Sequence, residues 1–172
     1  MALARKPAEH VRIRSAVPRD RGDMLHANRR AWEISYAHIF SPHEVRGLFQ
    51  NLLPQRGSWV FQRDRRIATI VAEVNKRVVG FIGVGTLLNK SEGEVTTFYI
   101  LPEYHGRGIG TRLWHAGLEE LERVGCTGAW VWVLAKAEAR HFYTSRGCVE
   151  RQRGTYTVGK HTETAIGYYL DF

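Results

Sequence analysis

Three alternating glycines, Gly106, Gly108 and Gly110, stand between an apolar, β-branched run and a helical pattern. Glycine lets the backbone approach a ligand closely and adopt φ > 0 where a turn needs it. The first N–H groups of a helix have no partner inside the helix, and they lie at the positive end of its dipole. Such a helix end binds anions, most often phosphate. The spacing therefore predicts a site for a phosphorylated ligand.

Two common phosphate-binding motifs do not fit this loop. A P-loop requires Gly-x-x-x-x-Gly-Lys-Ser/Thr, which the chain lacks. A dinucleotide-binding loop has the spacing Gly-x-Gly-x-x-Gly in a parallel βαβ unit, with an acidic residue about 20 positions further on. Here the spacing is Gly-x-Gly-x-Gly, and the following apolar run, Ala129 to Leu134, ends without a carboxylate. A purely structural glycine turn is the remaining alternative.

The elements that must position this loop follow from the apolar pattern and from the Pro and Gly breaks. We expect strands at Val11 to Val17, Ile67 to Val74, Val78 to Leu88, Glu94 to Leu101, Ala129 to Leu134 and two between Cys148 and Phe172, and helices at Asp20 to Ile39, His43 to Leu53, Ile109 to Val124 and Ala137 to Ser145. This order predicts an α+β fold in three layers: a mixed, mostly antiparallel sheet of six to seven strands flanked by about four helices.

The length of 172 residues predicts a single domain over residues 1–172. No segment approaches the roughly 20 apolar residues of a membrane span, and Ala2 to Pro7 lacks the apolar core of a secretory signal. Cys126 and Cys148 are too few for a disulfide framework and are interpreted as reduced, buried thiols. We therefore expect a cytoplasmic protein without a membrane partner.

The net charge of +8 raises the question of a nucleic-acid partner. The basic residues are spread along the chain, and the densest cluster, Arg63 to Arg66, is short and interrupted by an acid. No nucleic-acid recognition motif accompanies the charge, so no nucleic-acid partner is expected. The eight histidines show no spacing of zinc ligands, so no metal site is expected.

Two motifs make the chain resemble the GNAT superfamily of acyl-CoA-dependent N-acyltransferases. Tyr99 to Pro102, followed by Arg107 to Gly110, is similar to the family's strand end and glycine signature, and Lys136 to Cys148 is similar to its second motif. The resemblance covers the chain from Val11 to the C-terminus. His105, Lys136 and Cys148 depart from the family's Arg or Gln, Asn and Phe.

The resemblance implies acetyl-CoA as the acyl donor, with its diphosphate on the amides between Arg107 and Thr111. The Ile100 amide is implied as the donor to the thioester oxygen, at a bulge where two neighbouring strands splay apart. The residues expected to bind the donor are Tyr99, Ile100, Leu101, His105, Gly106, Arg107, Gly108, Ile109, Gly110, Thr111 and Lys136.

The resemblance also implies two groups that move protons. Tyr143 matches the family's proton donor to the departing thiolate, and a phenol pKa of about 10 suits a thiol leaving group. Packing on a short helix is the alternative role for Tyr143, although Phe142 could supply that packing. Glu94 is the candidate general base acting through water, with a solvated strand residue as its alternative and Glu92 as the substitute.

In the family, the first two helices form a wall of the acceptor cleft, so Trp32 and Tyr36 are candidate substrate-binding residues, with core packing as the alternative. The implied reaction is acetyl transfer to a primary amine of a small molecule or peptide by direct attack in a ternary complex. A homodimer is common in such families. A domain that binds acyl-CoA without turnover is the alternative function, and nucleic-acid binding is a third.

Overall fold

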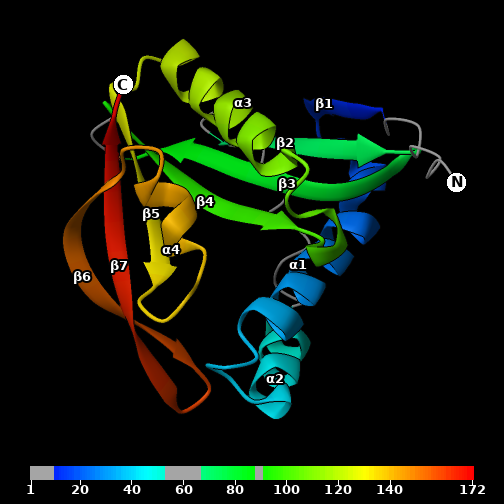
Figure 1. The fold of residues 1–172 in the computed structure, drawn as a ribbon, viewed down its shortest axis with the longest axis vertical. Helices are drawn as coiled ribbons and strands as arrows, with labels where there is room; N and C mark the ends of the chain where they lie inside the picture. The colour runs from blue at the N-terminus through cyan, green and yellow to red at the C-terminus, as the bar shows by residue number, and fades with distance from the viewer. Residues whose placement is uncertain (1–9, 53–66, 88–90) are drawn as a thin grey trace, which may run out of the picture.

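The computed structural model describes residues 10–52, 67–87 and 91–172. Within these ranges lie seven strands, β1 to β7, four α-helices, α1 to α4, and two short 3-10 turns. The strands form one sheet in the order β1-β2-β3-β4-β5-β7-β6, and only the β4–β5 pair among them is parallel (Figure 1). The predicted mixed, mostly antiparallel sheet is confirmed. Residues 1–9, the end of the expected helix at Leu53, the Arg63 to Arg66 cluster and the strand end at Leu88 lie outside the described residues.

The first half of the sheet is an antiparallel meander of β-branched and apolar residues. The strands are β1 (Val11–Ser15), β2 (Ile67–Val74), β3 (Arg77–Thr86) and β4 (Glu92–Ile100). Asn75 and Lys76 join β2 to β3 with φ of 49° and 66°. Two consecutive residues with φ > 0 match the right-handed twist of a hairpin, so β2 and β3 are joined by a tight turn.

The β4–β5 pair separates part of the way along the sheet. β5 (Gly128–Leu134) pairs in parallel with β4 only from Glu92↔Gly128 to Val95↔Val131, whereas it pairs with β7 (His161–Asp171) along its whole length. The expected splaying of two strands is confirmed. The bulge on β4 is not at Ile100 as expected: the register shift leaves Thr96 as the extra residue, because Val95 pairs with Val84 and Thr97 with Gly83.

Helices cover both faces of the sheet. α1 (Arg21–Ser35) packs on the face that carries Phe81 and Tyr99, whose rings are 5.7 Å apart. α3 (Ile109–Arg123) packs on the opposite face, where its Trp114 lies 6.2 Å from Phe98. α4 (Arg140–Thr144) lies on the α3 face, and α2 (Pro42–Leu52) lies beside α1 (Figure 1). The three expected layers are therefore present.

Close packing between α3 and the sheet depends on glycine. A Cβ atom at Gly117 would lie 2.9 Å from Ile82 Cδ1, and one at Gly93 would lie 2.7 Å from Leu121 Cδ1. Both contacts are shorter than van der Waals packing permits, so a side chain at either position would push helix and sheet apart. These contacts fix α3, and with it the glycine loop at its N-terminus, against β3 and β4.

Two helices are shorter than expected. α1 ends at Ser35, after which Ile39 N and Phe40 N both donate to the Tyr36 carbonyl in a closing turn. α4 begins at Arg140 because Ala137 to Ala139 form tighter three-residue turns. The last antiparallel pair, β6 (Val149–Val158) and β7, forms the predicted hairpin around Gly159, whose φ is 61°.

Candidate active site

The glycine loop joins the end of β4 to the start of α3. Gly106 and Gly108 have φ of 72° and 75°, the left-handed region that favours glycine. Gly108 is the N-cap of α3, and in the described chain no side chain caps this helix end. The amides of the first turn, at Ile109, Gly110 and Thr111, therefore keep their donors for a bound anion.

Gly110 brings the first turn of α3 close to two neighbouring elements. A Cβ atom there would lie 3.1 Å from Ile100 Cδ1 on β4 and 3.3 Å from Phe142 Cε2 on α4. These distances are tighter than ordinary packing, so the absence of a side chain lets the helix end sit between the strand and α4. The glycine spacing is thus explained by backbone conformation at two positions and by close approach at the third.

Two side chains hold the loop in place. His105 Nε2 lies 3.2 Å from the Ile100 carbonyl, and because a carbonyl only accepts, this nitrogen donates. The Arg107 guanidinium donates to the Glu103 carbonyl at 2.9 Å and lies 4.8 Å from the centre of the Tyr104 ring. His105, a departure from the family pattern, ties the loop back to the last residue of β4.

Arg146 is a site residue that the sequence analysis did not identify. Its Nη2 donates to Thr111 Oγ1 at 2.6 Å, and its Nη1 donates to the Phe142 carbonyl at 2.9 Å. The guanidinium lies 3.4 Å from the centre of the Phe142 ring, and burial lowers its pKa without removing the charge. The only signal in the sequence was its place just before Gly147 in the second motif. A fixed positive charge thus stands beside the first turn of α3.

The loop, Arg146 and the end of β4 line a cavity of about 650 Å³, which we call the donor cavity. The side chains of Leu101 and Ile109, two of the expected donor-binding residues, are buried in the core, so only main-chain groups of these residues could contact a donor, and Arg107 does not line the cavity. The expected residues that line it are Tyr99, Ile100, His105, Gly106, Gly108, Gly110, Thr111 and Tyr143.

Lys136 does not line the donor cavity. Its side chain is 61% exposed, and its Nζ donates to Glu163 Oε1 at 2.8 Å. The main-chain carbonyl of Lys136 accepts from His38 Nε2 at 2.9 Å. The structure therefore places this residue in an ion pair with β7, whereas the resemblance places a donor-binding residue here.

The Tyr143 side chain lies on α4 and is only 7% exposed. Its ring contacts those of Trp114 and Phe142 at 5.6 and 5.5 Å between centroids. Burial, and then the neighbouring phenols of Tyr36 and Tyr99, raises the pKa of Tyr143 well above its ordinary value. The phenol therefore carries its proton near neutral pH, and it lines the donor cavity. The raised pKa also makes it a weaker acid than the phenol of pKa about 10 that the sequence led us to expect.

The Ile100 amide faces the opening between β4 and β5. The next amide, Leu101 N, donates to the Val79 carbonyl on β3 at 2.8 Å. Because successive groups of a strand point to opposite edges, the Ile100 amide points away from β3. β5 has left β4 by this point, since their pairing ends at Val95↔Val131. A main-chain donor is thus available in the opening.

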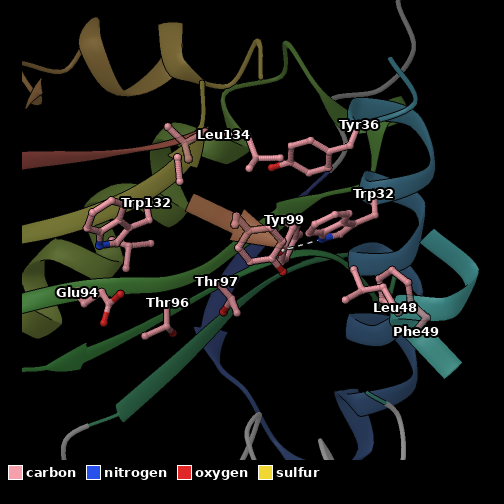
Figure 2. A pocket seen from close by; sticks show the side chains of 14 residues that line it. Trp32, Tyr36, Leu48, Phe49, Glu94, Thr96, Thr97, Tyr99, Trp132 and Leu134 are labelled. Carbon is pink, nitrogen blue, oxygen red and sulfur yellow. Dashed lines mark hydrogen bonds between the residues drawn. The ribbon is translucent and has the colours of Figure 1, made fainter. Parts of the chain in front are cut away.

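A second cavity, of about 460 Å³, is lined by residues of α1, α2 and strands β4 to β7, and we call it the acceptor cavity (Figure 2). Its wall is largely aromatic: the centroids of the Trp32 and Tyr36 rings are 4.6 Å apart, and Trp32 Nε1 donates to Tyr99 Oη at 3.1 Å. The remaining lining residues are Leu48, Phe49, Glu94, Val95, Thr96, Thr97, Trp132, Val133, Leu134, Tyr156 and Ala165.

Glu94 supplies a carboxylate to the acceptor cavity, at the end opposite Tyr36 (Figure 2). Burial raises the pKa of this carboxyl group above its ordinary value. Glu92, the substitute base, does not line the cavity. A carboxylate whose pKa is displaced toward neutrality is a better proton acceptor near pH 7.

The two cavities meet at Tyr36 and Tyr99, which line both. Tyr143 lines only the donor cavity and Glu94 only the acceptor cavity. A protonated phenol and a carboxylate thus lie on opposite sides of one aromatic boundary. This arrangement can give a proton to a group leaving on one side and take a proton from a nucleophile entering on the other.

The two cysteines are poor candidates for a nucleophile. Both are free and buried. Burial raises the pKa of Cys148 to about 11 and also raises that of Cys126, so both remain thiols near pH 7.

Within the described ranges no group of His, Cys, Asp and Glu side chains is arranged to hold a metal ion. No helix of those ranges has the length and apolar composition needed to cross a membrane.

Several proteins are similar to this chain in sequence. Residues 25–148 match the acetyltransferase (GNAT) family. An uncharacterized N-acetyltransferase of Archaeoglobus fulgidus is 33% identical over 94 residues, which cover 51% of this chain and 63% of that protein. An uncharacterized N-acetyltransferase of Mycobacterium tuberculosis is 30% identical over 104 residues, 58% of this chain and 64% of that protein. The chain thus spans less than two thirds of the length of these relatives.

Solved structures share the fold. PaiA N-acetyltransferase from Thermoplasma acidophilum, in complex with coenzyme A, has a TM-score of 0.81 at 18% identity, over 95% of this chain and 99% of that one. Ribosomal-protein-S18-alanine N-acetyltransferase from Escherichia coli has a TM-score of 0.67 at 22% identity, over 94% of each chain. The sheet and helices are therefore those of the GNAT fold. Because the family match extends over more than half of its length, the chain belongs to the acetyltransferase (GNAT) family.

Proposed function

We propose that this protein is an N-acetyltransferase that transfers the acetyl group of acetyl-CoA to a primary amine by direct attack in a ternary complex. Membership of the acetyltransferase (GNAT) family supports acetyl transfer. The observation that carries the proposal is the junction of the two cavities at Tyr36 and Tyr99. A donor and an acceptor bound in the two cavities would meet there, without a covalent enzyme intermediate.

The donor cavity supports binding of a nucleotide thioester. The amides at the start of α3 offer several donors to a diphosphate, and the nearby Arg146 adds a positive charge. Gly110 leaves room between Ile100 and Phe142 that a side chain would fill. From this loop the cavity extends to Tyr143 and Tyr99. The diphosphate would lie on the loop and the thioester at the aromatic boundary.

The chemical step divides among three groups. The amine nitrogen attacks the thioester carbon, forming the C–N bond, while the Ile100 amide donates to the developing oxyanion. The C–S bond then breaks, and the sulfur takes the phenolic proton of Tyr143. The proton lost by nitrogen passes through water to Glu94. Exchange with solvent returns Tyr143 and Glu94 to their starting forms.

The acceptor cavity supports a small-molecule or peptide amine. Its volume of about 460 Å³ suits a small molecule or a single extended side chain. The rings of Trp32, Tyr36 and Tyr99 provide apolar faces that also attract a cation. An ammonium group is the form in which most amines arrive at neutral pH; it loses one proton to solvent before attack, and Glu94 lies within the same cavity to accept the proton that nitrogen releases on attack.

The test is acetyl-CoA turnover over a panel of primary amines, measured as release of the free thiol. We expect release that depends on both acetyl-CoA and an amine, with a mass increase of one acetyl group on the amine. Binding of acetyl-CoA alone should raise the melting temperature, because a ligand that binds only the folded state stabilises it. Absence of thermal stabilisation at saturating acetyl-CoA would refute the proposal.

A further inference from the structure

His161 connects two elements, α2 and β7, that both contribute residues to the wall of the acceptor cavity. It is the first residue of β7, directly after the turn that closes the β6–β7 hairpin. Its Nδ1 lies 3.1 Å from Glu44 Oε1 on α2, and its Nε2 lies 2.9 Å from Glu163 Oε1 on β7. The edge of its ring packs against Phe40, with centroids 4.9 Å apart. We call Glu44, His161 and Glu163 the His161 bridge.

Both carboxylates of the bridge are held by other groups. Ser41 N and Oγ each donate to Glu44 Oε2 at 2.8 Å, which is a capping box at the start of α2. Lys136 Nζ donates to Glu163 Oε1 at 2.8 Å. The Glu163 side chain is only 11% exposed. The two carboxylates are thus fixed on separate elements, and the imidazole is the group that joins them.

The state of the imidazole determines whether both bonds form. Neutral imidazole has one N–H donor and one lone pair, so it can donate to only one of the two carboxylates. Imidazolium donates from both nitrogens and also offsets the charge of Glu44 and Glu163. The hydrogen bond to Glu163, and then that to Glu44, raises the pKa of His161 above its ordinary value.

The bridge joins α2 and the β6–β7 hairpin, two parts of the acceptor cavity that otherwise make few contacts with each other within the described residues. α2 contributes Leu48 and Phe49 to the lining, and β6 contributes Tyr156. α2 and the tip of the β6–β7 hairpin lie at the same end of the molecule (Figure 1). We propose that protonated His161 positions α2 against the hairpin and so completes the acceptor cavity, a role that rests on the proposed function for the identity of that cavity.

The direction of the pH effect follows from linkage. A group whose folded pKa is raised contributes stabilisation in full below its unfolded pKa, about 6.5 for histidine, and loses it as the pH rises through the folded pKa. The wall should therefore be best ordered at about pH 6 and loosen above neutrality. The KM for the acceptor, and not the KM for acetyl-CoA, should carry the effect.

The kinetic test compares the full chain with His161→Gln, which keeps a hydrogen-bonding side chain but cannot be protonated. Titration of the amine itself cancels in the ratio of the two acceptor KM values at each pH. We expect the acceptor KM of His161→Gln to be about five times that of the wild type at about pH 6. The ratio of variant to wild-type KM should fall to about one at pH 8.5, as for a partly exposed ion pair. The kcat and the KM for acetyl-CoA should stay within about twofold.

Two further variants act as controls. His115→Gln, at an exposed position on α3, should reproduce the wild-type pH profile. Glu163→Gln removes one carboxylate of the bridge and so lowers the pKa of His161. The loss of acceptor affinity with rising pH should therefore begin at a lower pH in this variant than in the wild type. The proposal would be overturned if the acceptor KM ratio of His161→Gln to wild type stayed constant between about pH 6 and 8.5, at any value. A contact that is merely structural does not titrate.

Hydrogen exchange separates this proposal from the proposed function. In the wild type, amides of α2 should lose protection between about pH 6 and 8.5 after correction for intrinsic exchange, and in His161→Gln they should not. This readout needs no acceptor. If no amine is acetylated but α2 shows the pH-dependent protection, only the proposed function fails. Equal α2 protection profiles in the two proteins would refute the His161 bridge.

Discussion

The indole Nε1 of Trp32 donates to the hydroxyl oxygen of Tyr99 at 3.1 Å, and this bond joins α1 to β4 across the boundary between the two cavities. Trp32 lines only the acceptor cavity, whereas Tyr99 lines both. The Trp32 side chain is 6% exposed, so the bond is shielded from water. Tyr99 thus has an orientation set from the acceptor side, although its ring also lines the donor cavity.

Trp32→Phe should weaken acceptor binding more than donor binding. The change keeps an aromatic ring but removes the donor to Tyr99, and a neutral hydrogen bond of this kind contributes about 1 kcal/mol. We expect the KM for the acceptor to rise about threefold to tenfold, with the dissociation constant of acetyl-CoA unchanged. Steady-state kinetics and calorimetry measure the two quantities. An equal loss of affinity for the acceptor and for acetyl-CoA would contradict the assignment of Trp32 to the acceptor cavity alone.

Tyr143→Phe should lower kcat without weakening acetyl-CoA binding. Only the hydroxyl group is lost, so the contacts with Trp114 and Phe142 remain. General acid catalysis contributes about 10²- to 10⁴-fold, and we expect a loss in this range. Thiol release measured with saturating substrates gives kcat. An undiminished kcat would remove Tyr143 from the mechanism.

Glu94→Gln should reduce activity and at the same time stabilise the fold. A base works in its deprotonated form, so wild-type kcat/KM should fall as the pH falls through the raised pKa of Glu94. The kcat/KM of the variant should not show this decrease at low pH. Because folding raises this pKa, the charged carboxylate costs stability above it, and the amide removes that cost. The melting temperature of Glu94→Gln at about pH 8 should therefore exceed that of the wild type. A lower melting temperature would indicate a structural role.

Gly108→Ala should impair donor binding through the backbone. Space around Gly108 is open, but its φ of 75° costs an L-residue about 1–2 kcal/mol. We expect the dissociation constant of acetyl-CoA to rise about tenfold as the first turn of α3 shifts. Gly22→Ala is the matched control, because Gly22 also has open space but no positive φ. Equal affinities in the two variants would contradict the loop's role.

Arg146→Gln should weaken acetyl-CoA binding and reduce its salt dependence. The guanidinium is positioned beside the first turn of α3 by Thr111 and Phe142, and charged hydrogen bonds to phosphate are about twice as strong as neutral ones. We expect an increase of about tenfold in the dissociation constant at low salt, with kcat unchanged at saturation. If Arg146→Gln bound acetyl-CoA as tightly as the wild type at low salt and also at high salt, Arg146 would lie outside the donor site.

The local features of this fold could be predicted from neighbouring residues. Alternation of apolar residues predicted the strands, and the Asn75-Lys76 turn between two of these strands forms with two positive φ values. Gly106 and Gly108 stand where φ must be positive, so the glycine loop was recognisable before the fold was known. In each case the cause acts over a few residues along the chain.

Long-range contacts could not be predicted in this way. Lys136 was expected at the donor, but Glu163, 27 residues away, holds its ammonium group. Arg146 was not among the expected donor-binding residues, yet Thr111, 35 residues earlier, fixes its guanidinium. The expected bulge at Ile100 lies at Thr96 because the pairing of β3 with β4 sets the register. Such contacts depend on which elements become neighbours.

Periodicity, turn residues and the glycine motif were sufficient to determine from the sequence alone the order of the elements and the loop for which we propose anion binding. The meeting of the donor and acceptor cavities at Tyr36 and Tyr99, with Tyr143 and Glu94 on opposite sides, depended on the folded chain. The physical reason is that β5 separates from β4 after Val131 while it stays paired with β7, and the resulting opening is a property of three strands distant in sequence.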